Sequence, residues 1–598
     1  MQDFACLLTI TLLSLSTVSL SADLESRRKA LNDLLHERWE YTMRTSPIYA
    51  SFLGDKRYND QLDDFSQKAI DDNLEQDRHF LTRFEAIDTT GFPEQEILNK
   101  QLMVRDLKMS VEGARFKSWE MPVDQTNGVQ VGLPALVNVL AFDSVKDYED
   151  YISRLKQIPR LFDQVEIQMR KGIADNWMPP KSVLGEVVKQ ANELATTPAD
   201  KNPFAEPFNK FPDAIGEADR KRLRDTGLTS IHDSVLPAYA KFATFVRDEY
   251  EPKGRPEPGV WSLPNGDEYY AFRVKDSTTT SLTPEEIHQL GLAQVKLIED
   301  KMLAVAKQLG FSDLKSFYAS IPNNPKVHVH SRQEILDRYQ KYIDQMYTKL
   351  PDLFGRLPKE KLDVKPIEEF REKGASTHYL EGTPDGSRKA HVMVNTGDYE
   401  KRTIIGAETT AYHEGVPGHH LQISIAQELP SLPMFRQHES YTAYVEGWAL
   451  YAEELGKEVG FYQDPYSYYG HLEADMLRAI RLVVDTGFHY KHWTRQRVVD
   501  FFHDHSAIDE PEVQGETDRY MAWPAQALGY KVGQLEIIKL RQYSRDQLGD
   551  KFDIRGFHDE VLSGGALPLD VLSTRIHDWV GRQRVQASSA EIKPAAAK

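Results

Sequence analysis

The chain has 598 residues, and its 91 Asp and Glu exceed its 73 Lys and Arg, which gives a formal net charge of −18. Nucleic acids and anionic membrane surfaces both attract basic faces, so we expect neither as a partner. Hydrophobic residues form 40% of the chain and aromatic residues 10%, which is enough for a large core and excludes a disordered or fibrous protein.

The first 22 residues have the composition of a secretory signal peptide. No residue from Phe4 to Ala22 is charged, and small residues precede an acidic start. We therefore expect cleavage near Ser21 or Ala22 and a periplasmic or secreted protein. Cleavage would remove Cys6, the only cysteine, and leave a mature chain without disulfides or thiol chemistry. No later apolar run reaches the ~18 residues that a membrane-spanning helix needs.

Most of the remaining chain has the apolar spacing of helices. Two clear examples are residues 24–44, which Ser46-Pro47 ends, and residues 146–170. Thr283-Pro284 begins another helix, because a capping hydroxyl is followed by Pro at the first helical position. The best strand is His391–Asn395, which follows a Pro-Asp-Gly turn. The pattern predicts a mainly α fold, with a helical shell around a small β-sheet.

We expect one large body after the signal peptide. Residues 23–586 would form a single helical catalytic body, with a helical N-terminal part at about 23–280 and a part that carries the motifs at about 281–586. Residues 587–598 would form a flexible tail.

The strongest chemical signal is a segment in which His413, Glu414, His419 and His420 fall within eight residues. Zinc peptidases carry H-E-x-x-H, which sets two histidines one helical turn apart, but here Pro417 occupies the second position. In a straight helix His420 would lie ~10.5 Å along the axis from His413, too far for ~2.1 Å bonds to one ion. A kink or bulge at the Pro-Gly pair removes this problem and favours His419 over His420 as the second ligand. The other interpretation is a histidine-rich turn between two helices.

A candidate third ligand follows in the chain. Glu439, Glu446 and Glu453 are spaced by seven and share one helix face, and Glu446 has apolar and small neighbours that mark an interior position. A buried carboxylate needs a partner, because burying an unpaired charge is costly. A zinc ion or an ordinary buried salt bridge would supply that partner.

A third stretch carries Arg478, Arg481, Asp485 and His489 at spacings of three and four on an otherwise apolar helix. Such a stripe is either a solvated face or the lining of a wet channel. Further on, Tyr530 lies in a Gly-flanked segment and could donate its hydroxyl to a developing oxyanion, although a core tyrosine fits the same pattern.

These motifs resemble a known family. Four segments carry the likeness to the bacterial family called domain of unknown function 885: residues 411–422, 446–453, 478–487 and 530–533, with a weaker likeness at 46–47 and 53–58. That family resembles gluzincin-type metallopeptidases, with a helical, channel-containing body similar to thimet oligopeptidase and angiotensin-converting enzyme. The resemblance implies a zincin-like helical shell around a central channel. It also implies His413, His419 and Glu446 as zinc ligands and Glu414 as the base.

Residues and resemblance together predict a zinc-dependent hydrolase with one Zn²⁺ per chain. Three protein ligands leave a position for water, whose pKa zinc lowers towards ~7, and Glu414 would accept the proton of that water. Tyr530 or His489 would stabilise the oxyanion. The substrate would be a short peptide, cleaved inside the channel by a carboxypeptidase or a dipeptidase.

Substrate contacts are expected from three arginines and one strand. Arg478, Arg481 or Arg519 could bind a C-terminal carboxylate, to which a guanidinium is geometrically suited. The strand at 391–395, which includes Asn395, could pair with an extended peptide backbone.

Two other functions remain open. One is a zinc hydrolase of another amide or ester, such as a cell-wall fragment. The other is a non-catalytic binding protein, against which Glu414 argues, because a structural zinc site is normally closed by four protein ligands and needs no base.

Overall fold

The computed structural model describes the backbone of residues 3–367, 372, 376–383, 386 and 388–591, and the side chains of these residues except 3–22 and 586–591. Helices dominate this part of the chain, and its only sheet has three short strands. The predicted mainly α fold is therefore confirmed.

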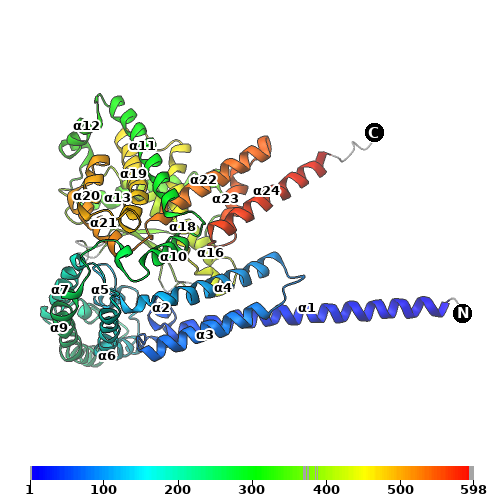
Figure 1. Cartoon of the computed structure of the whole chain (residues 1–598), viewed down its shortest axis with the longest axis horizontal. Coiled ribbons are helices and arrows are strands. Elements are labelled where there is room, and N and C mark those ends of the chain that lie inside the picture. Colours follow the sequence, from blue (N-terminus) through cyan, green and yellow to red (C-terminus); the bar gives the residue numbers. More distant parts are fainter. Residues whose placement is uncertain (1–2, 368–371, 373–375, 384–385, 387, 592–598) are drawn as a thin grey trace.

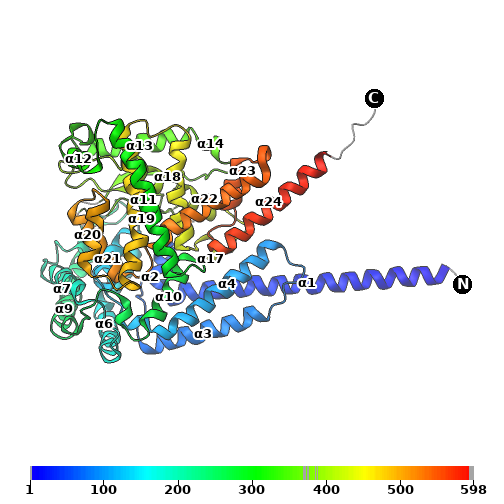
Figure 2. The same cartoon turned by 45° about the horizontal axis from the view of Figure 1, so that its top comes forward.

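The N-terminal helices form a layer along one side of the molecule (Figure 1). They are α1 (Asp3–Thr45), α2 (Pro47–Phe52), α3 (Gln67–Ala86), α4 (Glu94–Gly113) and α5 (Val129–Ala135). Leu31, Leu35, Phe80 and Phe84 are buried between α1 and α3, at the helical spacing predicted for residues 24–44. The N-terminal end of α1 extends away from the body in both Figure 1 and Figure 2.

A second group of helices has its own core. It consists of α6 (Val145–Asp175), α7 (Lys181–Thr196), α8 (Glu217–Ser230) and α9 (Leu236–Phe245). Ser144 and Asp147 form a reciprocal capping box at the start of α6, which begins one residue before the predicted range. Leu155, Leu161 and Val165 then point into the core at helical spacing.

The largest core lies in the C-terminal half. The helices here are α10 (Gly266–Thr278), α11 (Pro284–Gln308), α12 (Leu314–Ser320), α13 (Arg332–Tyr347), α14 (Leu350–Leu353), α15 (Ala407–Glu414), α16 (His419–Gln427), α17 (Met434–Gln437), α18 (Thr442–Glu458), α19 (Pro465–His489), α20 (Arg495–His505), α21 (Glu510–Ala522), α22 (Leu528–Leu548), α23 (Ile554–Leu562) and α24 (Leu569–Glu591). Thr283 caps α11 and Pro284 is its first residue, as the sequence predicts. Helix α11 packs along α19, and α18 packs along α22 (Figure 2).

The small sheet has the strand order β1–β3–β2. Strand β1 (Asp363–Pro366) runs parallel to β3 (His391–Val394), and β2 (His378–Leu380) runs antiparallel to it. The strand predicted at 391–395 is thus confirmed, and all four residues of β3 are buried. The expectation that it pairs with a substrate is wrong, because β3 is the central strand and both its edges are occupied. Of its neighbours, β2 lies nearer to the motif residues.

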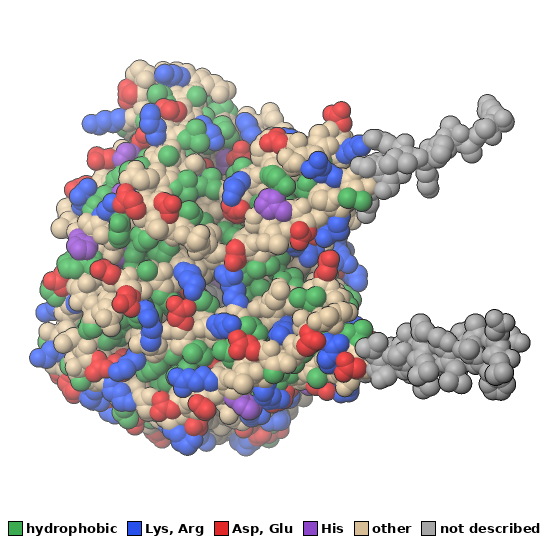
Figure 3. Space-filling view, turned by 45° about the vertical axis from the view of Figure 1, so that its right-hand side comes forward, with side chains coloured by type: hydrophobic (Ala, Val, Ile, Leu, Met, Phe, Trp, Pro, Cys, Tyr) green, Lys and Arg blue, Asp and Glu red, His purple; other side chains and the backbone are tan. Residues whose placement is uncertain are grey.

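The chain ends differ from expectation in one respect. Helix α24 continues to Glu591, beyond the predicted start of the tail at residue 587, and residues 592–598 lie outside the described part. The predicted signal peptide falls within the first half of α1, and its cleavage stays a prediction. Among the residues described in full, no helix is long and apolar enough to cross a membrane. On the face seen in Figure 3, acidic and basic side chains are interspersed.

Candidate metal centre and active site

The helix that carries the histidine motif is interrupted. Helix α15 ends at Glu414, and α16 begins at His419 after a turn of residues 415–418. Gly418 is required there, because a Cβ atom at this position would lie 1.9 Å from the carbonyl oxygen of His413. The predicted break at the Pro-Gly pair is therefore present, but it is a full stop and restart of the helix rather than a bulge within it.

The break brings three side chains together. One ligand atom each of His413, His419 and Glu446 lies within 4.8 Å of the other two. The Nε2 atoms of His413 and His419 are 3.6 and 3.5 Å from Oε2 of Glu446. Bonds of ~2.1 Å at tetrahedral angles place neighbouring zinc ligands ~3.4 Å apart, so this donor set fits a zinc ion. Hydrogen bonds to both histidines outweigh burial and hold the pKa of Glu446 well below its ordinary value.

His420 lies outside this cluster. Its Nδ1 atom is 3.3 Å from the Tyr379 hydroxyl and from the Ser424 hydroxyl, and its Nε2 atom donates to the carbonyl oxygen of Glu360. Burial lowers the pKa of His420 to about 4, so it is a neutral core histidine. Of the two candidates for the second ligand, the structure brings only His419 to Glu446.

His413 is oriented by partners that the sequence analysis did not assign. Its Nδ1 atom is 2.8 Å from Oε1 of Glu453. The other carboxylate oxygen of Glu453, Oε2, accepts a hydrogen bond from Thr409 and lies 3.4 Å from Nδ1 of His471. Burial lowers the pKa of His413, but hydrogen bonds to Glu446 and Glu453 outweigh it and raise the pKa to about 9. Carboxylates in this position fix the tautomer and ring orientation of metal-binding histidines. The seven-residue spacing from Glu446 to Glu453 was the available signal.

Glycines bring Tyr530 close to Glu446. Where α18 crosses α22, a Cβ atom on Gly533 would lie 1.7 Å from the carbonyl oxygen of Ala443, and one on Gly447 would lie 2.5 Å from the Gly533 backbone. Only glycine permits this approach. Burial and the negative charge of Glu446 both raise the pKa of Tyr530, so its hydroxyl stays protonated and able to donate.

Arg481 and Arg519 are engaged with other protein groups. Both donate to Glu516, Arg481 also donates to the Tyr520 hydroxyl, and Arg519 donates to Gln526. The guanidinium of Arg481 lies 4.7 Å from the ring centre of Tyr530. Arg481 thus lies against Tyr530, and both arginines already bond to a carboxylate, contrary to the expectation that they bind a substrate carboxylate, although Nη1 of Arg481 has no partner.

His489 is not available to an oxyanion in this geometry. Its Nδ1 atom accepts from the Val260 N–H, and its Nε2 atom donates to the Tyr520 carbonyl oxygen, so both ring nitrogens bond to the backbone. Burial lowers its pKa to about 3. Nearby, Asp485 accepts from the Tyr270 hydroxyl and the Ala525 N–H. This part of the predicted stripe is buried and is neither a solvated face nor a channel lining.

Glu414 directly follows His413 in the chain and contacts the sheet. It is half-buried, and its Oε2 atom accepts a 2.8 Å hydrogen bond from the N–H of Tyr379 in β2. That N–H points away from β3, so β2 presents its outer edge to Glu414. The side chain of Asn395, expected to contact a substrate, is engaged within the protein. Its Nδ2 atom donates to the Glu372 carbonyl oxygen, and its Oδ1 atom accepts from the Gly397 N–H.

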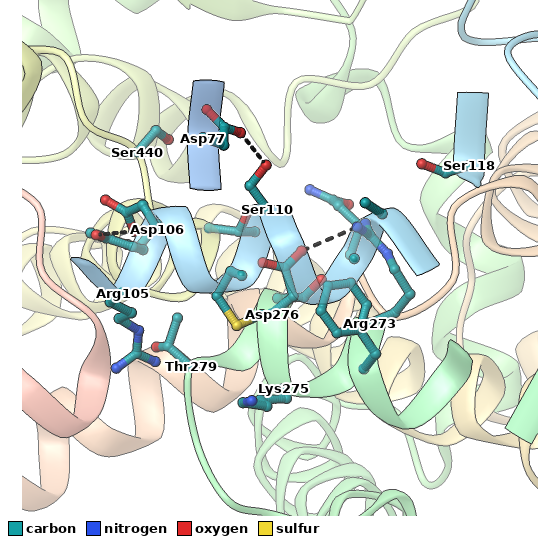
Figure 4. Close-up of a pocket in the computed structure, with 18 of the residues that line it drawn as sticks. Asp77, Arg105, Asp106, Ser110, Ser118, Arg273, Lys275, Asp276, Thr279 and Ser440 are labelled. Atoms are coloured by element: carbon teal, nitrogen blue, oxygen red, sulfur yellow. Dashed lines mark hydrogen bonds and ion pairs between the residues drawn. The ribbon is translucent and has the colours of Figure 1, made fainter. Parts of the chain in front are cut away.

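Two cavities reach the elements that carry these residues. The larger has a volume of about 690 Å³, and Figure 4 shows side chains from α4 and α10 around it. It also reaches Thr442, which lies one helical turn before Glu446, and Gln526. The smaller has a volume of about 330 Å³ and is lined by Thr409 and Thr410, one turn before His413 and Glu414. That these cavities join into a central channel stays a prediction.

A comparison with family models identifies the family of this chain. The model of a bacterial protein family of unknown function, DUF885, matches residues 47–576. The chain belongs to the DUF885 family. A search of curated proteins finds no significant match.

Two solved structures are similar over nearly the whole chain. A candidate lipoprotein from Colwellia psychrerythraea is 28% identical, with a TM-score of 0.89, over 93% of this chain and 99% of that one. A candidate lipoprotein of unknown function from Shewanella oneidensis is 17% identical, with a TM-score of 0.69, over 91% and 99% of the two chains, and this likeness concerns the fold alone. The likeness to gluzincin peptidases is not tested by these matches.

Proposed function

We propose that this DUF885 protein is a zinc-dependent peptidase that hydrolyses short peptides. The observation that carries the proposal is the cluster of His413, His419 and Glu446, whose ligand atoms have the mutual spacing of zinc ligands. Glu414 follows His413 directly, as the glutamate does in the H-E-x-x-H pattern. A zinc ion held there would supply a water of lowered pKa and polarise the substrate carbonyl.

The chain's own residues would do the rest of the work. Glu414 would accept the proton of the attacking water and donate it to the leaving amine, while the Tyr379 N–H holds one of its oxygens. Tyr530 would donate its hydroxyl to the developing oxyanion, held in place by Arg481 and the close contact of α18 with α22.

The outer edge of β2 favours a peptide over other amides and esters. Glu414 lies at that edge and already accepts from the Tyr379 N–H, so an extended peptide would pair there through the remaining backbone groups of the edge. We propose an envelope-associated or secreted location, supported by the signal-like first 22 residues and by the similar structure from Colwellia psychrerythraea, which is described as a candidate lipoprotein.

One experiment tests the proposal directly. The untagged protein should contain about one zinc per chain and should hydrolyse members of a panel of short peptides in preference to amide and ester analogues. Chelation should abolish this activity and leave the far-ultraviolet circular dichroism unchanged, because a body of this size has cores that do not depend on the ion. Active protein without metal would contradict the proposal, and hydrolysis of esters alone would point to the other class of hydrolase.

A further inference from the structure

The three arginines expected to bind substrate differ in their partners. Arg481 and Arg519 share Glu516, although Nη1 of Arg481 is buried without a hydrogen-bond partner. Arg478 forms no ion pair with any described residue: its Nη1 atom donates to the Ala474 carbonyl oxygen one turn back, and its Nε atom is buried without a partner. A buried guanidinium nitrogen without an acceptor is costly, so an acceptor from outside the chain would be favoured there.

Arg478 lines the smaller cavity. Thr409 and Thr410 of α15 also line it, as does Thr377, which lies two residues before Tyr379 of β2. Four residues at 1.5 Å each separate Thr410 from Glu414, so the cavity lies ~6 Å along α15 from the proposed base. An extended peptide covers this distance with one or two residues.

The charge of this cavity suits an anion. Arg402, exposed at its edge, also forms no ion pair among the described residues. Two acidic side chains, Glu473 and Glu512, also line the cavity and would repel an anion when ionised. Burial raises the pKa of Glu473 to about 7 and also raises that of Glu512. At neutral pH Glu473 is therefore only partly ionised, and Glu512 lies near enough to Arg478 to interact with its charge, but neither arginine of the cavity forms an ion pair with a described residue.

The larger cavity is different. Figure 4 shows Arg273 bonded to Asp276, and the other two basic side chains of this cavity are also paired, Arg105 with Asp570 and Lys275 with Glu112. Every cation there has a carboxylate partner, although Nε of Arg273 is also buried without a hydrogen bond. The difference between the two cavities therefore lies in the ion pairs, because neither arginine of the smaller cavity forms one with a described residue.

We propose that the smaller cavity binds the free α-carboxylate of a short peptide, with Arg478 as its main partner. This inference rests on the proposed function and narrows it: the enzyme would release one or two residues from the C-terminus, rather than cut within a longer chain. A guanidinium offers paired donors to a carboxylate, and Thr410 and Thr377 line the same cavity.

Binding tests the subsite without turnover. In a Glu414→Gln background, calorimetric titration compares N-acetyl-dialanine with its C-terminal amide. The free acid should bind roughly 10- to 150-fold more tightly, as expected for a hydrogen bond to a charged group. Adding Arg478→Gln should remove this preference, and Arg478→Lys should keep part of it, because lysine retains the charge but not the paired donors.

The outcomes are distinct. Acid and amide that bind alike, or that both fail to bind, overturn the subsite. A preference that survives Arg478→Gln means that the carboxylate binds elsewhere, for example to the metal, and also overturns it. Arg273→Gln tests the larger cavity as a rival: loss of the preference in that variant would place the carboxylate there. Melting curves of each variant show whether a loss of binding comes from unfolding.

Hydrolysis separates this inference from the proposed function. With Glu414 intact, kcat/KM for the acid should fall in Arg478→Gln, mostly through KM, while kcat/KM for the amide should stay within about twofold. Hydrolysis of acid and amide at equal rates would sink the subsite and leave the peptidase standing. Binding that follows Arg478 without hydrolysis of any peptide would sink the peptidase and leave the subsite standing.

Discussion

The cluster of His413, His419 and Glu446 and the buried stripe on α19 contain the same kinds of side chain. Each has buried histidine and a carboxylate and lies in the C-terminal half of the protein. At the stripe, both nitrogens of His489 bond to backbone groups, and Asp485 accepts from Tyr270 and Ala525. At the cluster, His413 and His419 turn their Nε2 atoms towards one carboxylate at a spacing that fits an ion. Residue type and burial therefore do not distinguish a candidate metal site from a structural hydrogen-bond network. The distinguishing feature is that the ligand atoms of several side chains point towards one another.

The largest expected effect tests this convergence with two adjacent histidines. His419→Ala should lose most of the bound zinc, because it removes one of three ligands. His420→Ala should keep most of it, because His420 bonds to Tyr379, Ser424 and Glu360 instead. Metal content after gel filtration measures both. The reverse result would mean that α16 begins in another register than the one described.

The second test separates a ligand from the proposed base. Glu414→Gln keeps the acceptor for the Tyr379 N–H but cannot take a proton, so zinc should stay bound while turnover falls at least about a hundredfold. Glu446→Gln should instead lower metal retention, because a neutral amide is a poor zinc ligand. Zinc and turnover must be measured on the same preparations. Near-parental hydrolysis by zinc-loaded Glu414→Gln would show the mechanism to be wrong.

Local sequence patterns predicted a large share of this arrangement. The cap of α11 at Thr283 and the strand at His391 follow from patterns within a few residues, whereas the grouping of Glu446 with His413 and His419 was an expectation from the family resemblance. The partners of His489 did not follow, because Val260 is 229 residues away and Tyr520 is 31 residues away. A histidine at helical spacing looks the same whether its acceptor is a metal or a distant carbonyl.

The sheet shows the same limit. Strand β3 was predicted from its own residues, but its central place depends on β1 and β2, which are short and irregular in sequence. Glu453 was noted for its spacing and not for its role, because its bond to His413 spans 40 residues. Contacts between residues far apart in the sequence thus decide which of several polar residues orients the candidate ligands.

A third test concerns this unassigned carboxylate. Glu453→Gln should weaken zinc binding by about 10- to 100-fold, the usual effect of removing a partner that orients a metal-bound histidine. It should leave the three ligands in place, so saturating zinc should restore much of the activity. Competition with a chelator of known affinity measures the change. Asp475→Asn is a suitable control, since Asp475 is a buried carboxylate on α19 that pairs with Lys531; an equal loss of zinc affinity in that variant would make the effect one of general stability.

The smallest expected effect concerns the histidines of the structural network and pH. Burial lowers the pKa of His489 to about 3, whereas an unfolded histidine has a pKa near 6.5. Between these values the unfolded chain binds a proton that the folded chain does not, so the free energy of unfolding falls as pH drops from about 6.5 towards 3. His489→Gln retains an acceptor and a donor for Val260 and Tyr520 but does not titrate. It should therefore reduce the slope of stability against pH in this window by up to about 1.4 kcal/mol per pH unit.

Urea unfolding at several pH values measures the slope, which is separate from any constant loss of stability. His558→Gln should act in the same direction, because burial also lowers the pKa of His558 to about 3. Slopes equal to that of the parent in both variants would mean that these histidines are not held neutral in the fold.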